Sequence, residues 1–404
     1  MSAVTQAISK LTNVELWNAV RKYSPSFASH TAKATKDLFT EAGFAELTRV
    51  DNTILNDFLR LSVRVALQQV NISQARDPLA DSGFGESYDN PWGAINQRIA
   101  VDSIKPVNPA YKNLQDGQSI DPFVVRKPKT SERFYQQNFD YQSFITMQDF
   151  NIKQVFVSEY GVSELVAGIM QGLENGWIIQ KYTNKLEVLN AALNDNQIKE
   201  SQLVGVDYSG TWTDAELKAF IQTVMDTVSM MTISAQTSAF NMAGFASVQD
   251  KSRLKLLIRA GYTNALRVQT LAGTFNPDQL NTGVDIIEVE NFGGIKYQLK
   301  GGAALYPAYN QFGEEIGLNE QENQLEATHQ KTDADVVAVD PNADIVAILA
   351  DKGFMFETYQ NEYSVETIRN PRGKYDNYFA SAPNNGIHYD RNYNFVVFKK
   401  ATQS

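Results

Sequence analysis

The sequence feature that most constrains the fold is a stretch of helical periodicity from Val162 to Leu193. Apolar residues recur at every third or fourth position along it, which places them on one side of an α-helix. This apolar stripe consists of Val162, Val166, Ile169, Leu173, Trp177, Tyr182, Leu186, Leu189 and Leu193. At about 1.5 Å per residue the helix would be roughly 48 Å long. Because this is roughly three times the usual length in globular domains, we expect one long helix to organise the chain.

Three glycines, Gly168, Gly172 and Gly176, recur at every fourth position within this stretch. Each destabilises a helix by about 1 kcal/mol relative to alanine, but it also allows a neighbour to approach closely. In a membrane helix this spacing would indicate dimerisation, but the nearby Gln171 and Glu174 are too polar for a bilayer. No apolar run in the chain reaches about 18 residues, and the N-terminus lacks the pattern of a signal peptide. The sequence therefore predicts no membrane association.

Residues 1–91 carry only isolated helical signals. Thr12 and Glu15 form a predicted capping box that opens one helix, and apolar residues at helical spacing predict another from about Asn52 to Val65. The rest of this region has the composition of loops. Since it holds too little apolar pattern to fold alone, we expect an arm that lies over another surface.

Residues 92–145 predict a projecting hairpin. Prolines separate two short β-like runs, Phe123–Arg126 and Arg133–Tyr135, and most of the charge lies between them. An isolated hairpin is only marginally stable in water, so a partner surface is expected. The predicted inter-subunit contact residues are Arg126, Lys127, Lys129, Arg133, Phe134 and Tyr135. Four of them are cations, for which an acidic neighbouring subunit is a better partner than nucleic acid in a chain of net charge −10.

Residues 213–350 predict a compact α/β domain. Thr213 and Glu216 form a second capping box, which opens a helix. Further elements are expected at Leu254–Ile258 (strand), Thr263–Leu271 (helix), Val284–Val289 (strand) and Ile345–Leu349 (a strand that closes the sheet). Residues 313–335 are acidic and polar and predict an exposed loop. Four short strands are predicted in residues 351–404, at Phe354–Tyr359, Tyr363–Ile368, Tyr375–Phe379 and Asn394–Phe398.

Composition narrows the classes of function. The pI near 5.0 argues against tight nucleic-acid binding, which requires cations to replace phosphate counterions. The chain has no cysteine, so it has no disulfide framework and no thiolate metal site, and it is compatible with folding in a reducing cytosol. Charged residues are only 20% while aromatic residues are 11%. That balance favours a protein with extensive protein contacts, because interfaces enrich aromatic residues and deplete charge.

Motifs for catalysis and for cofactors are missing from the sequence. The three histidines, His30, His329 and His388, have no second histidine at metal-ligand spacing and are interpreted as surface or turn residues. The paired glycines at 293–294 and 301–302 lack the lysine and the spacing of a phosphate loop and are interpreted as turns. Asp333, Asp335, Asp340 and Asp344 lack the glycine and closing glutamate of a calcium loop. We therefore predict no catalytic residue, no metal and no cofactor.

Asp351 is the one carboxylate whose position raises the question of catalysis, because it follows the apolar run Ile345–Leu349 and precedes Gly353. A catalytic carboxylate needs a second acid, a base or a metal, and only Lys352 and apolar residues stand beside it. A turn in which Gly353 has positive φ is the better interpretation.

Three segments carry a resemblance to a known family. They are RLKLLIRAGYTNALRVQTLAGTFN at 253–276, VDIIEVENF at 284–292 and ADIVAILADKGFMFETYQ at 343–360. With the order of arm, hairpin, long helix, α/β domain and returning strands, the chain resembles the major capsid proteins of tailed double-stranded DNA phages. It is most similar in character to those of small podoviruses that infect Gram-positive bacteria.

The resemblance implies an α+β fold of the Hong Kong 97 type. In that fold residues 1–91 would be the N-terminal arm, residues 92–145 the extended hairpin called the E-loop, and residues 146–212 a peripheral domain with a spine helix at 162–193. Residues 213–350 would be the axial domain, and residues 351–404 would return to the peripheral domain. The sequence contains no evident N-terminal scaffolding segment and no added C-terminal immunoglobulin-like domain.

The function implied by the resemblance is self-assembly into pentamers and hexamers of an icosahedral shell that encloses the phage DNA. The implied partners are other copies of the chain, a scaffolding protein and a portal, with packaged DNA adjacent but not bound sequence-specifically. The implied location is the virion capsid, assembled in the bacterial cytoplasm. Two alternatives stay open at this point: another virion component that forms a ring or fibre, and an α/β hydrolase-like enzyme that uses Asp351.

Overall fold

The structure is a computed structural model of residues 1–404. It describes residues 13–31, 33, 75–89, 95–102, 115–119, 121, 123, 125, 127–148, 161–208, 212–233, 237–262, 284–310, 315–322, 324–359, 364–373 and 375–401. The chain forms two compact units, and each is assembled from three separate segments. The first unit contains Met1–Asp77, Asn138–Lys181 and Gln360–Asn385, and the second contains Pro78–Gln137, Tyr182–Tyr359 and Gly386–Ser404.

The predicted long helix is confirmed. Helix α7 runs from Gly161 to Leu193, a length of 33 residues, so it begins in the first unit and ends in the second. Leu173, Leu186 and Leu189 of the predicted stripe are buried. At Gly168, Gly172 and Gly176, however, no described atom lies within 4 Å of the place where a Cβ would stand. The close neighbour that these glycines would admit is therefore not found in the described part of this chain.

Besides the first part of α7, the described residues of the first unit form two short helices and one sheet. Helix α1 (Asn13–Tyr23) confirms the first predicted helix and buries Trp17 and Val20, whereas Thr12 and the second predicted helix (Asn52–Val65) lie outside the described residues. Helix α2 (Pro25–His30) ends at His30, in a region whose composition predicts a loop. The sheet elements of this unit are β4 (Phe139–Gln148), β14 (Ser364–Asn370) and the first part of β15 (Tyr375–Tyr389). Strands β14 and β4 pair antiparallel with opposite edges of β15.

The main sheet of the second unit has the order β5-β16-β12-β6-β7. Its strands are β5 (Leu203–Val206), β6 (Leu254–Arg259), β7 (Asp285–Val289), β12 (Ile345–Asp351) and β16 (Phe395–Lys400). The predicted strands are confirmed as β6, β7, β12 and β16, whereas β5 was not predicted. Strand β12 lies in the middle of the sheet and does not close it. Every residue of β12 is buried, as expected for a central strand covered on both faces.

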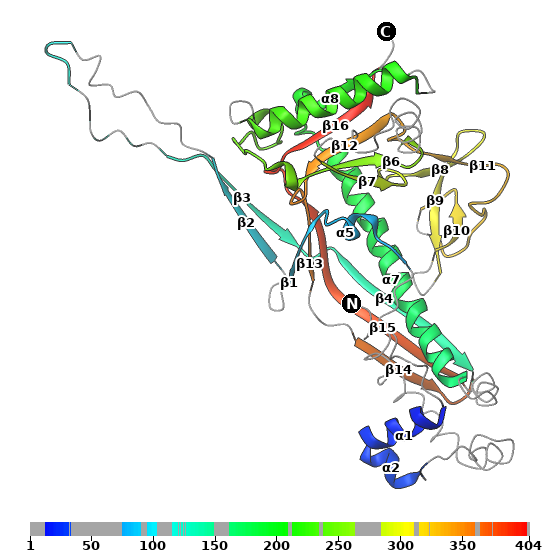
Figure 1. The fold of residues 1–404 in the computed structure, drawn as a ribbon. Helices are drawn as coiled ribbons and strands as arrows, with labels where there is room; N and C mark the ends of the chain where they lie inside the picture. The colour runs from blue at the N-terminus through cyan, green and yellow to red at the C-terminus, as the bar shows by residue number, and fades with distance from the viewer. Residues whose placement is uncertain are drawn as a thin grey trace, which may run out of the picture. The chain divides into compact units, whose positions relative to one another are not determined.

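Helix α8 (Asp214–Thr232) covers this sheet (Figure 1). It begins as predicted, because the Thr213 side chain accepts a hydrogen bond from the Glu216 backbone while the Glu216 carboxylate accepts from Thr213 N–H. Its apolar side packs into one core with residues of all five strands. The buried side chains that α8 contributes are Leu217, Phe220, Val224, Val228 and Met231. The predicted helix Thr263–Leu271 lies outside the described residues.

A second, smaller sheet has the order β10-β9-β8-β11. Its strands are β8 (Lys296–Leu299), β9 (Ala304–Tyr309), β10 (Glu315–Asn319) and β11 (Val336–Val339). The prediction of an exposed loop over 313–335 is wrong at β10, where Leu318 is fully buried. The segment has more acidic than apolar residues, and its composition therefore predicts a loop. Its few apolar residues are nevertheless sufficient to hold an edge strand against the sheet.

The predicted C-terminal strands are confirmed as β13 (Met355–Tyr359), β14, β15 and β16. They are divided between two sheets, because β16 pairs with β12 and β5 while β13 pairs with β15. On its other side β13 pairs in parallel with β1 (Glu86–Asp89), which follows the short helix α5 (Pro78–Asp81). The division of the chain into the five predicted domains remains a prediction.

The predicted hairpin exists, but with a different first strand. Strand β2 (Ile95–Val101) pairs antiparallel with β3 (Thr130–Gln136), with Ile95 opposite Gln136 and Val101 opposite Thr130. The run that we assigned as the first strand, Phe123–Arg126, is not one, since Phe123 lies in a turn and 85% of its side chain is exposed. Val124 and Arg126 lie outside the described residues.

The predicted corner at Asp351 is confirmed, but its physical basis differs from the prediction. Gly353 is not among the glycines with positive φ. It is needed because a Cβ there would come within 2.7 Å of the Tyr393 ring. The Asp351 carboxylate, fully buried, accepts from Gly353 N–H at 2.7 Å and from Arg253 at 3.0 and 3.2 Å. Asp351 therefore joins the end of β12 to the start of β6.

Replacing Asp351 by alanine is expected to destabilise the protein by about 3 kcal/mol, because it leaves Arg253 and a buried N–H without their acceptor. The measurement is urea denaturation of the unassembled full-length chain. The matched control is Asp344→Ala, because Asp344 is 49% exposed and pairs with Lys399 at 3.7 Å; its expected cost is below about 1 kcal/mol. Equal losses from the two variants would contradict the role assigned to Asp351.

Candidate inter-subunit surface

The β2–β3 hairpin has two different faces. Both strands alternate between exposed and half-buried residues along their whole length. The register sets Gln97 opposite Phe134 and Arg98 opposite Arg133, and residues directly opposite each other in an antiparallel pair share a face. The outer face therefore contains Ile95, Gln97, Ile99, Val101, Thr130, Glu132, Phe134 and Gln136.

The outer face is apolar at its centre and lacks a cover within the described chain. The exposed fractions are 54% for Ile95, 63% for Ile99, 60% for Val101 and 64% for Phe134. Phe134 lies diagonally from Ile95 and Ile99 across the two strands, close enough for a continuous apolar strip. Large apolar residues that gather on one exposed face mark a site of protein contact.

The inner face is anchored to the second unit through Arg98. Its guanidinium lies 3.7 Å from the centroid of the Phe356 ring and 5.1 Å from that of Tyr88. Arg98 also pairs with Asp390 at 3.2 Å, and Asp390 is almost fully buried. The Asn392 side chain and backbone both donate to the other Asp390 oxygen. This combination of a cation–π contact and a buried ion pair fixes the orientation of the hairpin base.

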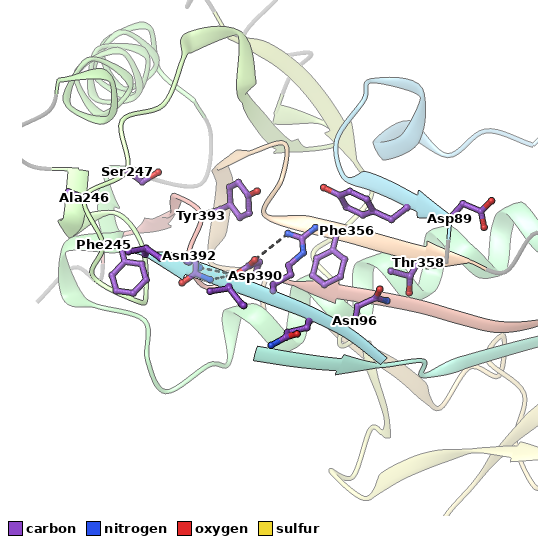
Figure 2. A pocket seen from close by; sticks show the side chains of 16 residues that line it. Asp89, Asn96, Phe245, Ala246, Ser247, Phe356, Thr358, Asp390, Asn392 and Tyr393 are labelled. Atoms are coloured by element: carbon purple, nitrogen blue, oxygen red, sulfur yellow. Dashed lines mark hydrogen bonds and ion pairs between the residues drawn. The ribbon is translucent and has the colours of Figure 1, made fainter. Parts of the chain in front are cut away.

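A pocket of about 630 Å³ lies beside this anchor. Figure 2 shows Phe356, Asp390 and Tyr393 on its wall, with Phe245 and Ser247 at the other end. Of its three charged lining groups, Arg98 and Asp390 form an ion pair, and Asp89 is exposed. A nucleophile paired with a base, as acyl or glycosyl transfer would require, is not found among the described residues of the lining.

Tyr135 and His388 pack together where the inner face meets β13 and β15. The Tyr135 ring contacts Phe356 edge-on at 4.9 Å and lies 5.2 Å from the His388 ring. Burial raises the pKa of Tyr135 to about 12, and the nearby Asp390 charge adds to this increase. Burial lowers the pKa of His388, and the Arg98 charge also lowers it, although a hydrogen bond with the Gln136 backbone opposes the shift. Both rings are therefore neutral components of the hairpin base.

The predicted contact residues are distributed over different surroundings. Phe134 lies on the outer face, whereas Arg133 and Tyr135 lie on the inner face. Lys127 is exposed. Lys129 donates to the Ala243 carbonyl oxygen at 3.1 Å and lies over the Phe245 ring at 4.7 Å. Arg126 lies outside the described residues.

Sequence reasoning missed Ile95, Ile99 and Val101, which are three of the four large apolar residues on the outer face. The run INQRIAV has apolar residues at three of its four odd positions. Such a period of two indicates a strand with one apolar face. The prolines and charges farther along the chain place the predicted hairpin at Phe123–Tyr135, beyond this run.

The residues considered for metal binding are mostly engaged in ion pairs. Asp340 pairs with Arg259 and Asp344 with Lys399. His329, Asp333 and Asp335 lie close enough together to hold a metal ion, with His329 Nδ1 at 4.0 and 3.9 Å from the two carboxylates. His388, interpreted as a surface or turn residue, is instead half-buried in β15.

Among the described helices, none combines the length and the apolar character that crossing a membrane requires.

The fold is that of phage capsid proteins of the Hong Kong 97 type. The capsid structure of Staphylococcus phage Andhra matches with a TM-score of 0.59 at 13% identity, over 82% of this chain and 86% of that chain. A chain from a structure of native bacteriophage P68 matches with a TM-score of 0.57 at 10% identity, over 82% and 86%. At these identities the likeness establishes the α+β fold.

Sequence comparison establishes the family. Residues 17–399 match the family of Phi29-like phage major capsid proteins, and the chain belongs to this family. The major capsid protein of Bacillus phage B103 is 24% identical over 371 residues, and that of Bacillus phage PZA is 23% identical over 371 residues. Each alignment covers 90% of this chain and 68% of the relative. The resemblance seen in the sequence is thus confirmed.

Lowering the pH from 7.5 to 5.5 is expected to destabilise the wild-type chain through His388. The pKa of His388 is lower in the folded state than its unfolded value of 6.5. The contribution of His388 to stability is therefore complete when the pH is above this unfolded pKa, and it is lost as the pH falls through the folded-state pKa. The substitution His388→Leu should therefore reduce the acid-induced loss of unfolding free energy, measured by urea denaturation at both pH values.

The matched control for this experiment is Phe354→Leu. It removes a buried ring that stacks on Phe395 and removes no titrating group, so it should lower stability equally at the two pH values. An acid-induced loss that is unchanged in His388→Leu would contradict the assignment.

Proposed function

We propose that the chain assembles with copies of itself, as pentamers and hexamers, into an icosahedral shell that encloses the double-stranded DNA of a phage. Membership of a family of phage major capsid proteins supports this proposal. The observation that carries it at the level of residues is the outer face of the hairpin, where Ile95, Ile99, Val101 and Phe134 are each more than half exposed.

Covering this face with a neighbouring copy provides free energy for assembly. Complete burial of a side chain of this size contributes about 1.5–3 kcal/mol. Because the four side chains are already partly covered, about 1 kcal/mol each is a realistic gain. Each contact of this kind is repeated by every copy around a closed ring, so a modest free energy per hairpin is multiplied over the shell.

The arrangement of the hairpin favours a contact between different surfaces of two copies. Its inner face is held by its own chain through Arg98 and Asp390, and the outer face is the one that the described residues leave exposed to a neighbour. A head-to-tail contact between different surfaces generates rings when the rotation closes. We propose that Phe134 contacts the neighbour directly and that Lys127 and Lys129 contribute charge at its border. Arg133 and Tyr135 would support the hairpin from the inner face.

The remaining partners follow from this role. We propose that a scaffolding protein and a portal take part in assembly, that assembly takes place in the bacterial cytoplasm, and that packaged DNA lies next to the shell without sequence-specific binding. The net charge of −10 supports the last point, since an acidic wall does not hold DNA tightly. The role is structural and not enzymatic, and the use of the Asp351 carboxylate by Arg253 and Gly353 supports this view.

The substitution Phe134→Lys is expected to prevent shell assembly while leaving the fold intact. It places a charge in the centre of the apolar outer face, and the Phe134 side chain is 64% exposed in the single chain, so little of its own core is lost. The measurements are negative-stain electron microscopy for shells and circular dichroism for the fold.

Phe134→Leu is the matched control, because it keeps an apolar side chain at the same position and should form shells. Normal shells from Phe134→Lys would contradict the assignment of the outer face. Wild-type chains that form only rings or fibres, or remain monomeric, would contradict the shell itself.

A further inference from the structure

Two lysine side chains from distant parts of the chain converge above Gly244. Lys129 directly precedes β3 and donates to the Ala243 carbonyl oxygen at 3.1 Å. Lys199 follows α7 and donates to the Ser238 carbonyl oxygen at 2.8 Å. A Cβ at Gly244 would stand 3.1 Å from Lys199 Nζ and 3.7 Å from Lys129 Nζ. Both ammonium groups therefore face the same small space.

Gly244 keeps this space open for two reasons. Its φ is +71°, a conformation that other residues adopt only with strain. A side chain at this position would also contact the Lys199 amine. The loop is held in place by Asn241, whose side chain bonds both the N–H and the carbonyl of Phe245. The space between the two amines is thus a property of a rigid loop.

The charges of the two lysines are not balanced within the described part of the chain. Neither Lys129 nor Lys199 forms an ion pair with a described carboxylate. Other lysines do so: Lys185 with Glu357, Lys255 with Asp285, Lys331 with Glu315 and Lys399 with Asp344. The chain has 46 acidic and 36 basic residues, so the lack of a described carboxylate partner does not come from a shortage of carboxylates.

The two amines also retain unused hydrogen-bond donors. An ammonium group has three N–H donors, and each of these lysines uses one on a backbone carbonyl in the described chain. Burial lowers the pKa of Lys199, and the charge of Lys129 lowers it further. An oxyanion between the amines would accept hydrogen bonds from both and relieve their mutual repulsion.

We propose that Lys129 and Lys199 together bind the carboxylate of an aspartate or glutamate side chain from a second copy of this chain. The inference rests on the proposed assembly of copies. Lys129 directly precedes Thr130, which lies on the outer face opposite Val101. A neighbour that covers this face therefore comes within reach of the site.

Charge complementarity favours a carboxylate of another copy as the ligand. The surface of the chain is acidic, with exposed carboxylates such as Glu320 and Asp335, so a second copy supplies the required anion in abundance. A phosphate of packaged DNA has the same oxyanion chemistry. Two lysines in a chain of net charge −10 form only a weak site for a polyanion, so we assign the site to protein.

The test uses shells assembled from an equal mixture of ¹⁴N- and ¹⁵N-labelled full-length chains. A carbodiimide joins an amine and a carboxylate only when they are in contact, and peptides of mixed isotope content identify links between copies. We expect mixed-isotope links from Lys129 or Lys199 to one acidic residue in shells, and their loss in unassembled protein. The internal control is Lys331 with Glu315, 2.8 Å apart, which should link within one copy in both states.

Variants give a second, independent measurement. Lys129→Gln with Lys199→Gln should raise the protein concentration required for assembly about tenfold, corresponding to about 1.4 kcal/mol per contact. Lys129→Arg with Lys199→Arg keeps the charge and should assemble close to the wild type. Lys218→Gln with Lys300→Gln, at two exposed positions, controls for the same change in net charge.

Several results would overturn the proposal. One is the absence of mixed-isotope links at both lysines in shells where the control pair reacts. Another is normal assembly of the double glutamine variant. Protection of the two lysines from acetylation in DNA-filled but not in empty shells would assign the site to phosphate. If the wild type forms no shells in micrographs, the proposed function fails first, and this inference fails with it.

Discussion

A two-stranded sheet has two faces, and the described part of the chain covers the β2–β3 hairpin on only one of them. On the inner face Arg98 combines a contact with the Phe356 ring and an ion pair with Asp390. This anchor determines which side of the hairpin stays exposed. The apolar outer face, the pocket beside the anchor and the position of Lys129 all depend on it. The hairpin is therefore oriented by its own chain before any neighbour arrives.

The second unit provides the rigid base for this anchor. Its central strand β12 is buried along its whole length and packs Val346, Ala347 and Leu349 into one core with α8. Asp351 at its end ties Arg253 to the following turn. The chain continues directly into β13, which carries Phe356. Asp390 lies between β15 and β16, and its N–H donates to the Phe354 carbonyl oxygen at 2.7 Å. The two partners of Arg98 are thus held by the core of the unit.

The sequence was most informative where a pattern was long or a local signal was specific. The α7 periodicity, the Thr213–Glu216 capping box and the apolar runs of β6 and β12 each predicted an element that the structure contains. It was least informative at the hairpin, where β2 is short and its Ile95 and Ile99 are exposed in the single chain. The prediction that Gly353 has positive φ also failed, because the reason for glycine there is the Tyr393 ring, a residue 40 positions away.

The sequence by itself determined the class of fold, the long helix, the acidic surface and the resemblance to phage capsid proteins, because these follow from periodicity, composition and residue order. Only the tertiary structure decided which hairpin residues face outward. A strand alternates its faces at every residue, so the partner strand and the register decide whether Phe134 or Tyr135 is exposed. Only the tertiary structure brought Lys129 and Lys199 together at Gly244, because contacts between residues 70 positions apart are made by packing and not by local pattern.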